Sequence, residues 1–365
     1  MLHVYRQITA LEKFRPVVLT QKREHAAQFP FANVTVIPRP ATRELRRFWA
    51  KKIRRAPLQI SHGEARRIEA ELRRAEAKLL HIYFGHIGVH LLPLLALRPL
   101  PIIVSFHGAD AMVDMEKPRY RAAMQEMLRR VTMVLARSHS LADRLADLGC
   151  ARAKIRIHRT GIPLEKLPFA QREPPADGGW QFLQACRLIE KKGLRTSLRA
   201  FSEFAKKFPA AKFTIAGEGP LLADLRAFST LLGLGEKVRF TGFVTQSALR
   251  ELFYRSHFFL HPSELGRDGN QEGVPNSMLE AMATGAPALA TTHGGIPEAV
   301  EHGLNGLLVP ERDYQALAGA ALELASERER YREMSAAAAR SIAEKFELRA
   351  QVRALENFYE EAMRA

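Results

Sequence analysis

The chain has 365 residues, of which 47% are hydrophobic and 26% charged, and its formal net charge at pH 7 is +16. At roughly 100 to 200 residues per domain, this length predicts two globular domains. No apolar run reaches the ~20 residues that span a bilayer, and no signal peptide is expected. The two cysteines, Cys150 and Cys186, have no Cys or His partner at metal-ligand spacing. Composition thus excludes membrane-spanning and disulfide-stapled classes and favours a reduced, cytoplasmic compartment.

The excess of positive over negative charge lies entirely in the first half of the chain. Residues 1–170 carry 31 Lys and Arg against 14 Asp and Glu, a balance of +17, whereas residues 171–365 carry 24 against 25, a balance of −1. A basic half suits nucleic acid, a phosphate-bearing substrate or an anionic leaflet, and general solubility is the alternative. No helix-turn-helix, zinc or aromatic–basic pattern is present, so a nucleic-acid binder is not favoured.

Short strands are predicted near the start, followed by a basic helix. The strands are 2–5, 16–20 and 33–37. Residues 41–55 predict a helix whose apolar residues share one face, namely Leu45, Phe48, Trp49 and Ile53. Its basic residues are Arg43, Arg46, Arg47, Lys51, Lys52, Arg54 and Arg55. Such a helix can lie on an anionic membrane surface, or its apolar face can pack against the domain's own sheet.

Two buried strands then end in loops that carry histidines. Residues 79–84 lead into Gly85-His86, and residues 101–106 lead into His107-Gly-Ala-Asp110. Open α/β sheets present ligand-binding groups at the carboxyl ends of their strands. We expect a capping or core role for His86 and a functional one for His107. Strands and helices alternate onward to residue 158, which predicts a parallel, doubly wound sheet. The Pro- and Gly-containing stretch 164–179 has the composition of a linker.

The second half repeats the pattern of strand, loop and helix. Strand 180–185 runs into Cys-Arg187-Leu-Ile-Glu-Lys-Lys192-Gly193 before a helix at 194–207. Cations at a helix start, beside a glycine that permits close approach, predict a cradle for a diphosphate, although a solvated charged loop is the alternative. Strand 212–216 leads into the tight turn at Gly217, which lets a ligand approach the backbone. Strands 238–240 and 257–261 follow.

The most informative stretch runs from Asp268 to Gly285. It reads Asp-Gly-Asn-Gln-Glu272-Gly-Val-Pro-Asn-Ser-Met-Leu-Glu280-Ala-Met-Ala-Thr-Gly. Glu272 lies in a Gly/Pro loop, and Glu280 lies one turn into a predicted helix whose first N–H groups form an anion site. Carboxylates that bind hydroxyls beside amides that hold phosphate predict a nucleotide-sugar site. Strands 286–292 and 307–309 and helices from residue 314 complete the chain.

Together these motifs resemble the retaining glycosyltransferases of family 4. The resemblance covers nearly the whole chain, and it is closest to members that build bacterial exopolysaccharides such as colanic acid. The motif Glu272-Gly-Val-Pro with Glu280-Ala-Met-Ala-Thr-Gly carries it most specifically. The family implies the GT-B fold, with two Rossmann-like α/β domains of parallel sheets facing across a cleft. We expect an acceptor domain at 1–165, a nucleotide-sugar domain at 166–346 and a final helix at 347–365 that returns to the first domain.

The resemblance also implies roles for single residues. Glu272 would accept hydrogen bonds from the donor sugar, and Glu280 would accept them from the ribose. Arg187 and Lys192 would neutralise the leaving diphosphate, and His107 would lie near the reacting face of the sugar, with Asp110 orienting its loop. The residues expected to bind the donor are Arg187, Lys192, Gly217, Gly273, Val274, Pro275, Asn276 and Glu280. No metal and no cofactor are expected. In place of the family's Gly-Gly loop after the first strand, this chain has Arg6-Gln-Ile-Thr.

The leading hypothesis is retaining hexosyl transfer from a UDP- or GDP-sugar to a saccharide or lipid-linked acceptor in exopolysaccharide biosynthesis. The enzyme would be cytoplasmic and peripheral at the inner face of the membrane, which residues 41–55 would contact. A soluble glycosyltransferase of small molecules and a nucleotide-sugar-binding protein without transfer activity remain alternatives.

Overall fold

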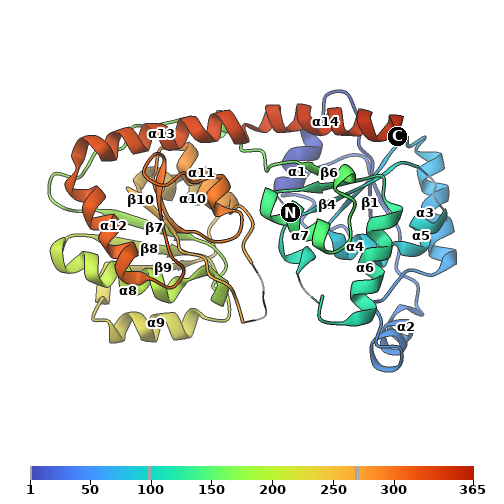
Figure 1. The fold of residues 1–365 in the computed structure, drawn as a ribbon, viewed down its shortest axis with the longest axis horizontal. Helices are drawn as coiled ribbons and strands as arrows, with labels where there is room; N and C mark the ends of the chain where they lie inside the picture. The colour runs from blue at the N-terminus through green and yellow to red at the C-terminus, as the bar shows by residue number, and fades with distance from the viewer. Residues whose placement is uncertain (1, 98–99, 113, 268, 270) are drawn as a thin grey trace. The chain divides into compact units, whose positions relative to one another are not determined.

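The protein is described by a computed structural model that covers residues 2–97, 100–112, 114–267, 269 and 271–365. The chain forms two compact units (Figure 1). The first unit contains the chain up to Gly161 together with Leu348–Ala365, and the second contains Ile162–Glu347. No helix of the described residues is long and apolar enough to cross a membrane.

The first unit is built on a parallel sheet of four strands. Its order is β3–β4–β5–β6, formed by Leu80–Tyr83, Ile102–Phe106, Met133–Ala136 and Ile155–Ile157. A separate parallel pair consists of β1 (Val18–Thr20) and β2 (Val34–Val36). All five residues of β4 are buried, as expected for a central strand covered on both faces. The helices are α1 (Leu2–Thr9), α2 (Arg43–Phe48), α3 (His62–Arg74), α4 (Gly85–His90), α5 (Leu92–Leu97), α6 (Pro118–Arg130), α7 (His139–Asp147) and α14 (Leu348–Arg364).

The first segment corrects one prediction. Residues 2–5, predicted as a strand, lie in the helix α1, so Arg6–Thr9 is part of that helix and does not form a loop after a strand. His3 and Gln7, four residues apart, both turn inward: the His3 ring lies 4.8 Å from that of His107, and Gln7 is buried and accepts a hydrogen bond from Arg137. The inward-facing positions of α1 recur with the period of a helix, but they are polar, so they do not resemble the apolar stripe by which a helix is usually predicted.

The basic helix does not pack against the sheet of its own unit, which was one of the two predicted positions for its apolar face. It runs as α2 and continues as a π-helix over Trp49–Ile53. Its four large apolar side chains are 53–63% exposed, so they do not pack against the sheet of the unit.

The second unit is built on a parallel sheet of six strands, in the order β12–β11–β10–β7–β8–β9. The strands are β7 (Gln181–Ala185), β8 (Lys212–Ala216), β9 (Val238–Gly242), β10 (Phe258–His261), β11 (Ala288–Thr291) and β12 (Gly306–Val309). The helices are α8 (Leu194–Lys207), α9 (Leu222–Leu231), α10 (Gln246–Arg255), α11 (Asn276–Ala283), α12 (Tyr314–Ser326) and α13 (Arg328–Phe346).

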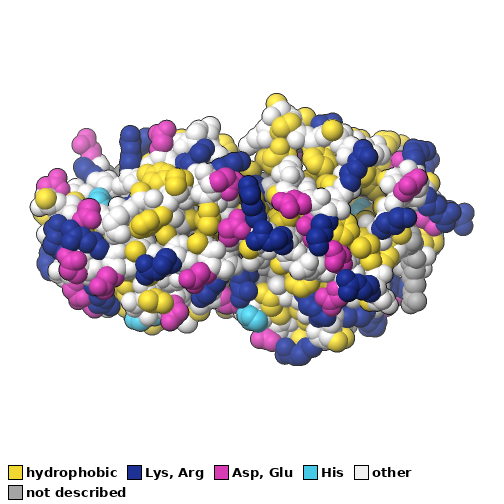
Figure 2. Space-filling model, turned by 90° about the horizontal axis from the view of Figure 1, so that it is seen from above, with side chains coloured by type: hydrophobic (Ala, Val, Ile, Leu, Met, Phe, Trp, Pro, Cys, Tyr) yellow, Lys and Arg dark blue, Asp and Glu magenta, His cyan; other side chains and the backbone are white. Residues whose placement is uncertain are grey.

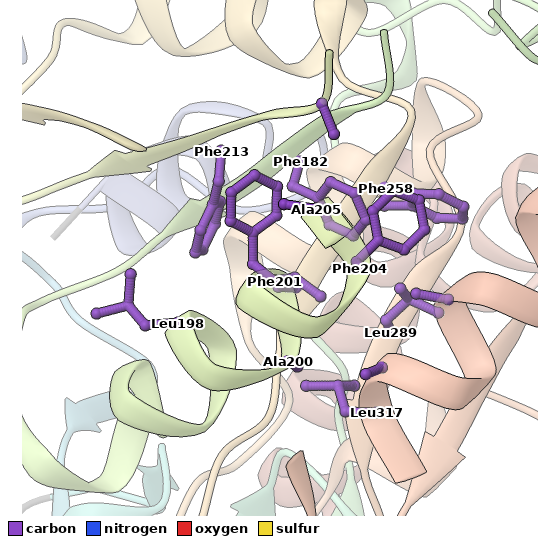
Figure 3. Close-up of a cluster of buried hydrophobic side chains, with 14 of the residues drawn as sticks. Phe182, Leu198, Ala200, Phe201, Phe204, Ala205, Phe213, Phe258, Leu289 and Leu317 are labelled. Atoms are coloured by element: carbon purple, nitrogen blue, oxygen red, sulfur yellow. The ribbon is translucent and has the colours of Figure 1, made fainter. Parts of the chain in front are cut away.

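Helices cover both faces of this sheet. One face packs against α8, α9 and α12 around a cluster of phenylalanines, in which the rings of Phe182 and Phe204 lie 4.8 Å apart (Figure 3). The other face packs against α10, α11 and α13. The stretch 164–179, whose composition suggested a linker, belongs to this unit. Its Arg172 is buried, and the guanidinium donates to the carbonyls of Ala170, Phe253 and Ser256, which satisfy its N–H groups.

Candidate functional site

The strand order of the second unit defines where a ligand can bind. From β7 the chain adds β8 and β9 on one side of the sheet, and then adds β10, β11 and β12 on the other. The neighbouring strands β7 and β10 are therefore the point at which the winding direction reverses. In open α/β sheets the ligand crevice lies outside the carboxyl ends of two such strands. The loop after β7 carries Arg187 and Lys192, and the loop after β10 carries Glu272.

These two loops touch at Gly193. This residue has a left-handed backbone with φ +61°, and a Cβ built on it would lie 1.8 Å from the carbonyl oxygen of Pro262. Only glycine fits such a position. The loop is also tied to its own strand, because the buried Gln184 of β7 donates to the carbonyl of Lys192 at 2.8 Å and accepts from Ser197 at 2.6 Å. Gln184 and Gly193 thus fix the position of the backbone at Lys192.

Glu272 and Lys192 form a buried ion pair across the two loops. Their side chains are 12% and 11% exposed, and the Nζ of Lys191 lies 3.8 Å from the same carboxylate. Burial alone would raise the pKa of Glu272, but attraction by Lys192 and Lys191 outweighs it and lowers the pKa to about 2. The carboxylate is therefore charged at neutral pH, and two ammonium groups lie beside it.

The backbone of Glu272 is held by a second pair of residues. Its N–H donates to Nε2 of His293 at 3.0 Å. Because Nε2 accepts, the ring proton lies on Nδ1, which donates to Glu311 at 2.6 Å. This hydrogen bond helps to keep the pKa of Glu311 below its usual value although burial acts the other way. Nothing in the sequence distinguished Glu311 from other charged residues that follow a strand.

Glu272 is followed by Gly273, Val274 and Pro275, and helix α11 begins at the next residue, Asn276. The hydroxyl of Ser277 donates to the carbonyl of Ala185 at 2.6 Å and so fixes the helix start against the end of β7. Glu280 is 6% exposed and lies one turn further along. The structure therefore brings Lys192, Glu272 and the first N–H groups of α11 to the carboxyl ends of β7 and β10.

The remaining predicted residues of this unit lie in adjoining loops. Gly217 follows β8 with φ +138°, and a Cβ built there would lie 1.9 Å from the carbonyl oxygen of Cys186, so the loops after β7 and β8 are in contact. Arg187 is exposed in the loop after β7. Asp268, at the start of the motif, lies outside the described residues.

His261 is a site residue that the sequence did not single out. It ends β10 and is fully buried, and neither ring nitrogen has a hydrogen-bond partner among the described residues. Burial, together with the nearby charge of Lys192, lowers its pKa to about 3, so the ring is neutral. The only available signal was its position at the carboxyl end of a strand.

In the first unit, His107 and Asp110 follow β4 as predicted. One carboxylate oxygen of Asp110 accepts from the backbone N–H of His107 at 2.9 Å, and the other accepts from that of Gly85 at 2.8 Å. Asp110 thus joins the loops that follow β3 and β4. The His107 ring lies 4.5 Å from that of Phe84, and burial lowers the pKa of His107 well below its ordinary value. The His107 ring is therefore a neutral imidazole. His86, by contrast, is not buried but lies exposed on α4.

The described residues include no group of three or more His, Cys, Asp or Glu side chains arranged to hold a metal ion. The charged side chains that meet at the candidate site are instead one carboxylate and two ammonium groups. Such an arrangement can accept hydrogen bonds from hydroxyls and attract a phosphate.

Both halves of this chain match models of known protein families. Residues 2–166 match the family model described as Glycosyltransferase Family 4, and residues 167–341 match that described as Glycosyl transferases group 1. A protein of Salmonella typhimurium named as a colanic acid biosynthesis glycosyltransferase, WcaL, is 35% identical over 239 residues, which are 65% of this chain and 58% of that protein. The amylovoran biosynthesis glycosyltransferase AmsK of Erwinia amylovora is 32% identical over 68% of this chain and 61% of its own.

The chain thus spans about three fifths of the length of these curated relatives. Among solved structures, Anabaena HepE in complex with UDP and glucose has a TM-score of 0.78 at 18% identity, covering 98% of this chain and 95% of HepE. A glycosyltransferase from Rickettsia africae has a TM-score of 0.75 at 15% identity, covering 99% of this chain and 95% of its own. These likenesses show the fold. The chain belongs to the family 4 glycosyltransferases and has the GT-B fold with two Rossmann-like units.

Proposed function

We propose that the protein transfers a hexose from a UDP- or GDP-sugar, with retention of anomeric configuration, to a saccharide or lipid-linked acceptor in exopolysaccharide biosynthesis. The observation that carries this proposal is the buried cluster of Glu272, Lys192 and Lys191 beside the start of α11, at the reversal point of the sheet. The exopolysaccharide context comes from the names of the relatives, and the UDP donor is favoured by the complexes of HepE with UDP and with UDP-glucose.

In this proposal different residues bind the sugars and the diphosphate of the donor. The charged carboxylate of Glu272 accepts hydrogen bonds from hydroxyls of the transferred sugar, and Glu280 accepts them from the ribose. Lys192 and the exposed Arg187 neutralise the diphosphate, together with the first N–H groups of α11. Attraction to the diphosphate replaces part of the attraction that Lys192 has for Glu272 before the donor binds.

The transfer exchanges one bond for another at the anomeric carbon. The bond to the diphosphate oxygen breaks and its electron pair leaves with the nucleotide. The acceptor hydroxyl oxygen bonds to the same face of the sugar, and its proton passes to the departing phosphate. Negative charge grows on the diphosphate in this step, which is where Arg187 and Lys192 lower the barrier most. No metal is required for this scheme.

Calorimetric titration of the protein with UDP and with GDP tests the donor site. We expect one nucleotide to bind at least about tenfold more tightly than the other, and Lys192→Ala to weaken it by about tenfold or more. Lys212→Ala is the matched control, because Lys212 is exposed at the opposite, amino edge of the same sheet. Absence of binding by both nucleotides would overturn the proposal. Incubation of the wild type with UDP- and GDP-sugars and a panel of acceptors then separates a transferase, which forms product, from a protein that only binds the donor.

A further inference from the structure

The first unit carries an exposed apolar face on a basic helix. Residues 43–53 are continuously helical, first as α2 and then as the π-helix. The large side chains on this face are Leu45 at 63%, Phe48 at 55%, Trp49 at 53% and Ile53 at 58% exposed. Single exposed apolar residues are common on protein surfaces, but a cluster of four within nine residues marks an interaction site. We call these four residues the apolar face.

The helix is attached to the unit by polar contacts. Arg46 forms an ion pair with Glu64, which caps α3, and also donates to the carbonyl of Gln59. Further along, Arg119 of α6 donates to the carbonyl of Arg54. An amphipathic helix of a soluble protein ordinarily buries its apolar face and exposes its charges. Here contacts of the charged side hold the helix in place, and the apolar face is left to solvent.

Positive charge surrounds the apolar face. Residues 41–55 contain seven Lys and Arg and one Glu. The side chains of Arg47, Lys52, Arg54 and Arg55 are exposed. The whole first unit has 33 Lys and Arg against 16 Asp and Glu, whereas the second unit has 22 against 23. A partner for this surface must therefore accept four apolar side chains and offer negative charge around them.

We propose that the apolar face docks on an anionic lipid bilayer, with Leu45, Phe48, Trp49 and Ile53 in the headgroup–acyl boundary and the surrounding cations against anionic headgroups. A bilayer supplies both requirements at one surface. A second copy of the chain would bring one positive surface against another, which disfavours self-association. Nucleic acid would satisfy the charges but not the aliphatic side chains. This inference does not rest on the proposed transfer reaction, because its tests measure binding.

Trp49 provides a reporter within the apolar face. The chain has two tryptophans, and Trp180 is buried in the second unit at 2% exposure. Emission from exposed indole therefore comes from Trp49. On addition of phosphatidylcholine–phosphatidylglycerol vesicles we expect a blue shift and quenching by brominated acyl chains, and no change with pure phosphatidylcholine vesicles. Unchanged emission with both vesicles would overturn the proposal.

Co-sedimentation with the same vesicles separates the two contributions. Phe48→Ser with Trp49→Ser should lower binding to anionic vesicles by about tenfold or more, because apolar burial is lost. Arg47→Gln, Lys52→Gln and Arg55→Gln together should lower it by a similar factor and remove the preference for anionic lipid. All five side chains are exposed, so the fold should persist, which circular dichroism checks. Wild-type binding should also weaken with added salt.

Two control variants carry matched changes on exposed residues of the second unit. Leu231→Ser with Leu304→Ser removes exposed apolar side chains there, and Lys212→Gln with Arg239→Gln and Arg255→Gln removes three charges. Both controls should bind vesicles as the wild type does. Binding that survives both helix variants would overturn the proposal, as would a dimer in sedimentation velocity that Phe48→Ser with Trp49→Ser converts to monomer, or a DNA complex that the same variant abolishes.

Discussion

Glu272 is a residue whose burial disfavours its charge but whose charge suits it to bind a ligand. Its carboxylate is buried and charged, and Lys192 and Lys191 compensate that charge. A buried ion pair is seldom more stabilising than apolar residues of equal volume. The value of this pair therefore lies in what it presents, namely a fixed acceptor for hydroxyls beside cations for phosphate. Two predictions follow from this balance of charge.

Loss of the carboxylate charge should slow transfer. Glu272→Gln keeps the shape of the side chain but removes its charge, and we expect the transfer rate to fall by about 10²- to 10³-fold. Lys192→Ala should act through the leaving diphosphate with a similar loss. Lys212→Ala, at the opposite edge of the sheet, should retain the wild-type rate. Product formation measured by chromatography decides the matter, and a Glu272→Gln enzyme with nearly full activity would remove this residue from the mechanism.

The same pair makes stability depend on acid pH. The folded-state pKa of Glu272, about 2, lies below the ordinary value of 4.5. Its contribution to the free energy of unfolding is therefore present above pH 4.5 and is lost as the pH falls toward 2. Urea unfolding of the wild type and of Glu272→Gln should show the larger difference at pH 6 and a smaller one at pH 3. A difference that is constant between these pH values would contradict the charged, paired state.

At the scale of elements, glycines decide how closely loops approach. Gly193 joins the loops after β7 and β10, where a Cβ would overlap the carbonyl of Pro262. We expect Gly193→Ala to lower the free energy of unfolding by about 3 kcal/mol or more. Gly233→Ala is the control, because its φ of +67° is equally strained but nothing lies within 4 Å of its Cβ. It should cost only about 1 kcal/mol. Equal losses in denaturant titrations would show that the contact at Pro262 is unimportant.

Helix α14 is held to the first unit by a buried carboxylate. Glu356 is 1% exposed, and its Oε1 accepts from the backbone N–H groups of Glu12 and Lys13 at 2.8 and 2.6 Å. Glu356→Ala leaves two donors unsatisfied, so we expect a loss of about 2–4 kcal/mol in the free energy of unfolding of this unit. Glu360→Ala, one turn on, removes exposed ion pairs with Lys13 and Arg364 and should change little. Comparable losses in the two variants, measured by thermal unfolding, would contradict this account.

Predictability differed among elements for a physical reason. Strands such as β4, whose five residues are all buried, carry an apolar signal that does not depend on the rest of the fold. The same holds for α11, which follows a Gly/Pro loop. By contrast, residues 2–5 were wrongly predicted as a strand, because the side chains that face inward, His3 and Gln7, are polar and are recognised only through their contacts with His107 and Arg137.

At the scale of the whole molecule, each unit has its own core and its own charge balance. Two buried clusters lie wholly within residues 162–346 and three lie within the first unit. On the face drawn in Figure 2, Lys and Arg side chains lie among Asp and Glu. Ion pairs such as Arg156–Glu361 illustrate this mixing. Residues 41–55 differ because they contain one acidic residue against seven basic ones.

The first unit needs the end of the chain. Leu355, Tyr359 and Ala362 of α14 pack on Ile103, Met133 and Leu135 of β4 and β5. Deletion of residues 348–365 would uncover these strand residues while leaving both cores of the second unit complete. We expect the unfolding transition of the first unit to move to lower temperature and that of the second to stay in place. Calorimetry with hydrogen exchange can assign each transition, and an equal shift of both would contradict the division of the cores.

The sequence by itself determined the fold class, the alternation of parallel strands and helices, and the motif from Glu272 to Glu280, because buried strands, glycine turns and helix starts leave local patterns. Only the tertiary structure decided which charges meet. Nothing local pairs Lys192 with Glu272, eighty residues away, or places Glu311 behind His293. It also decided that Leu45, Phe48, Trp49 and Ile53 face solvent, because an amphipathic pattern specifies a face and the rest of the fold specifies what covers it.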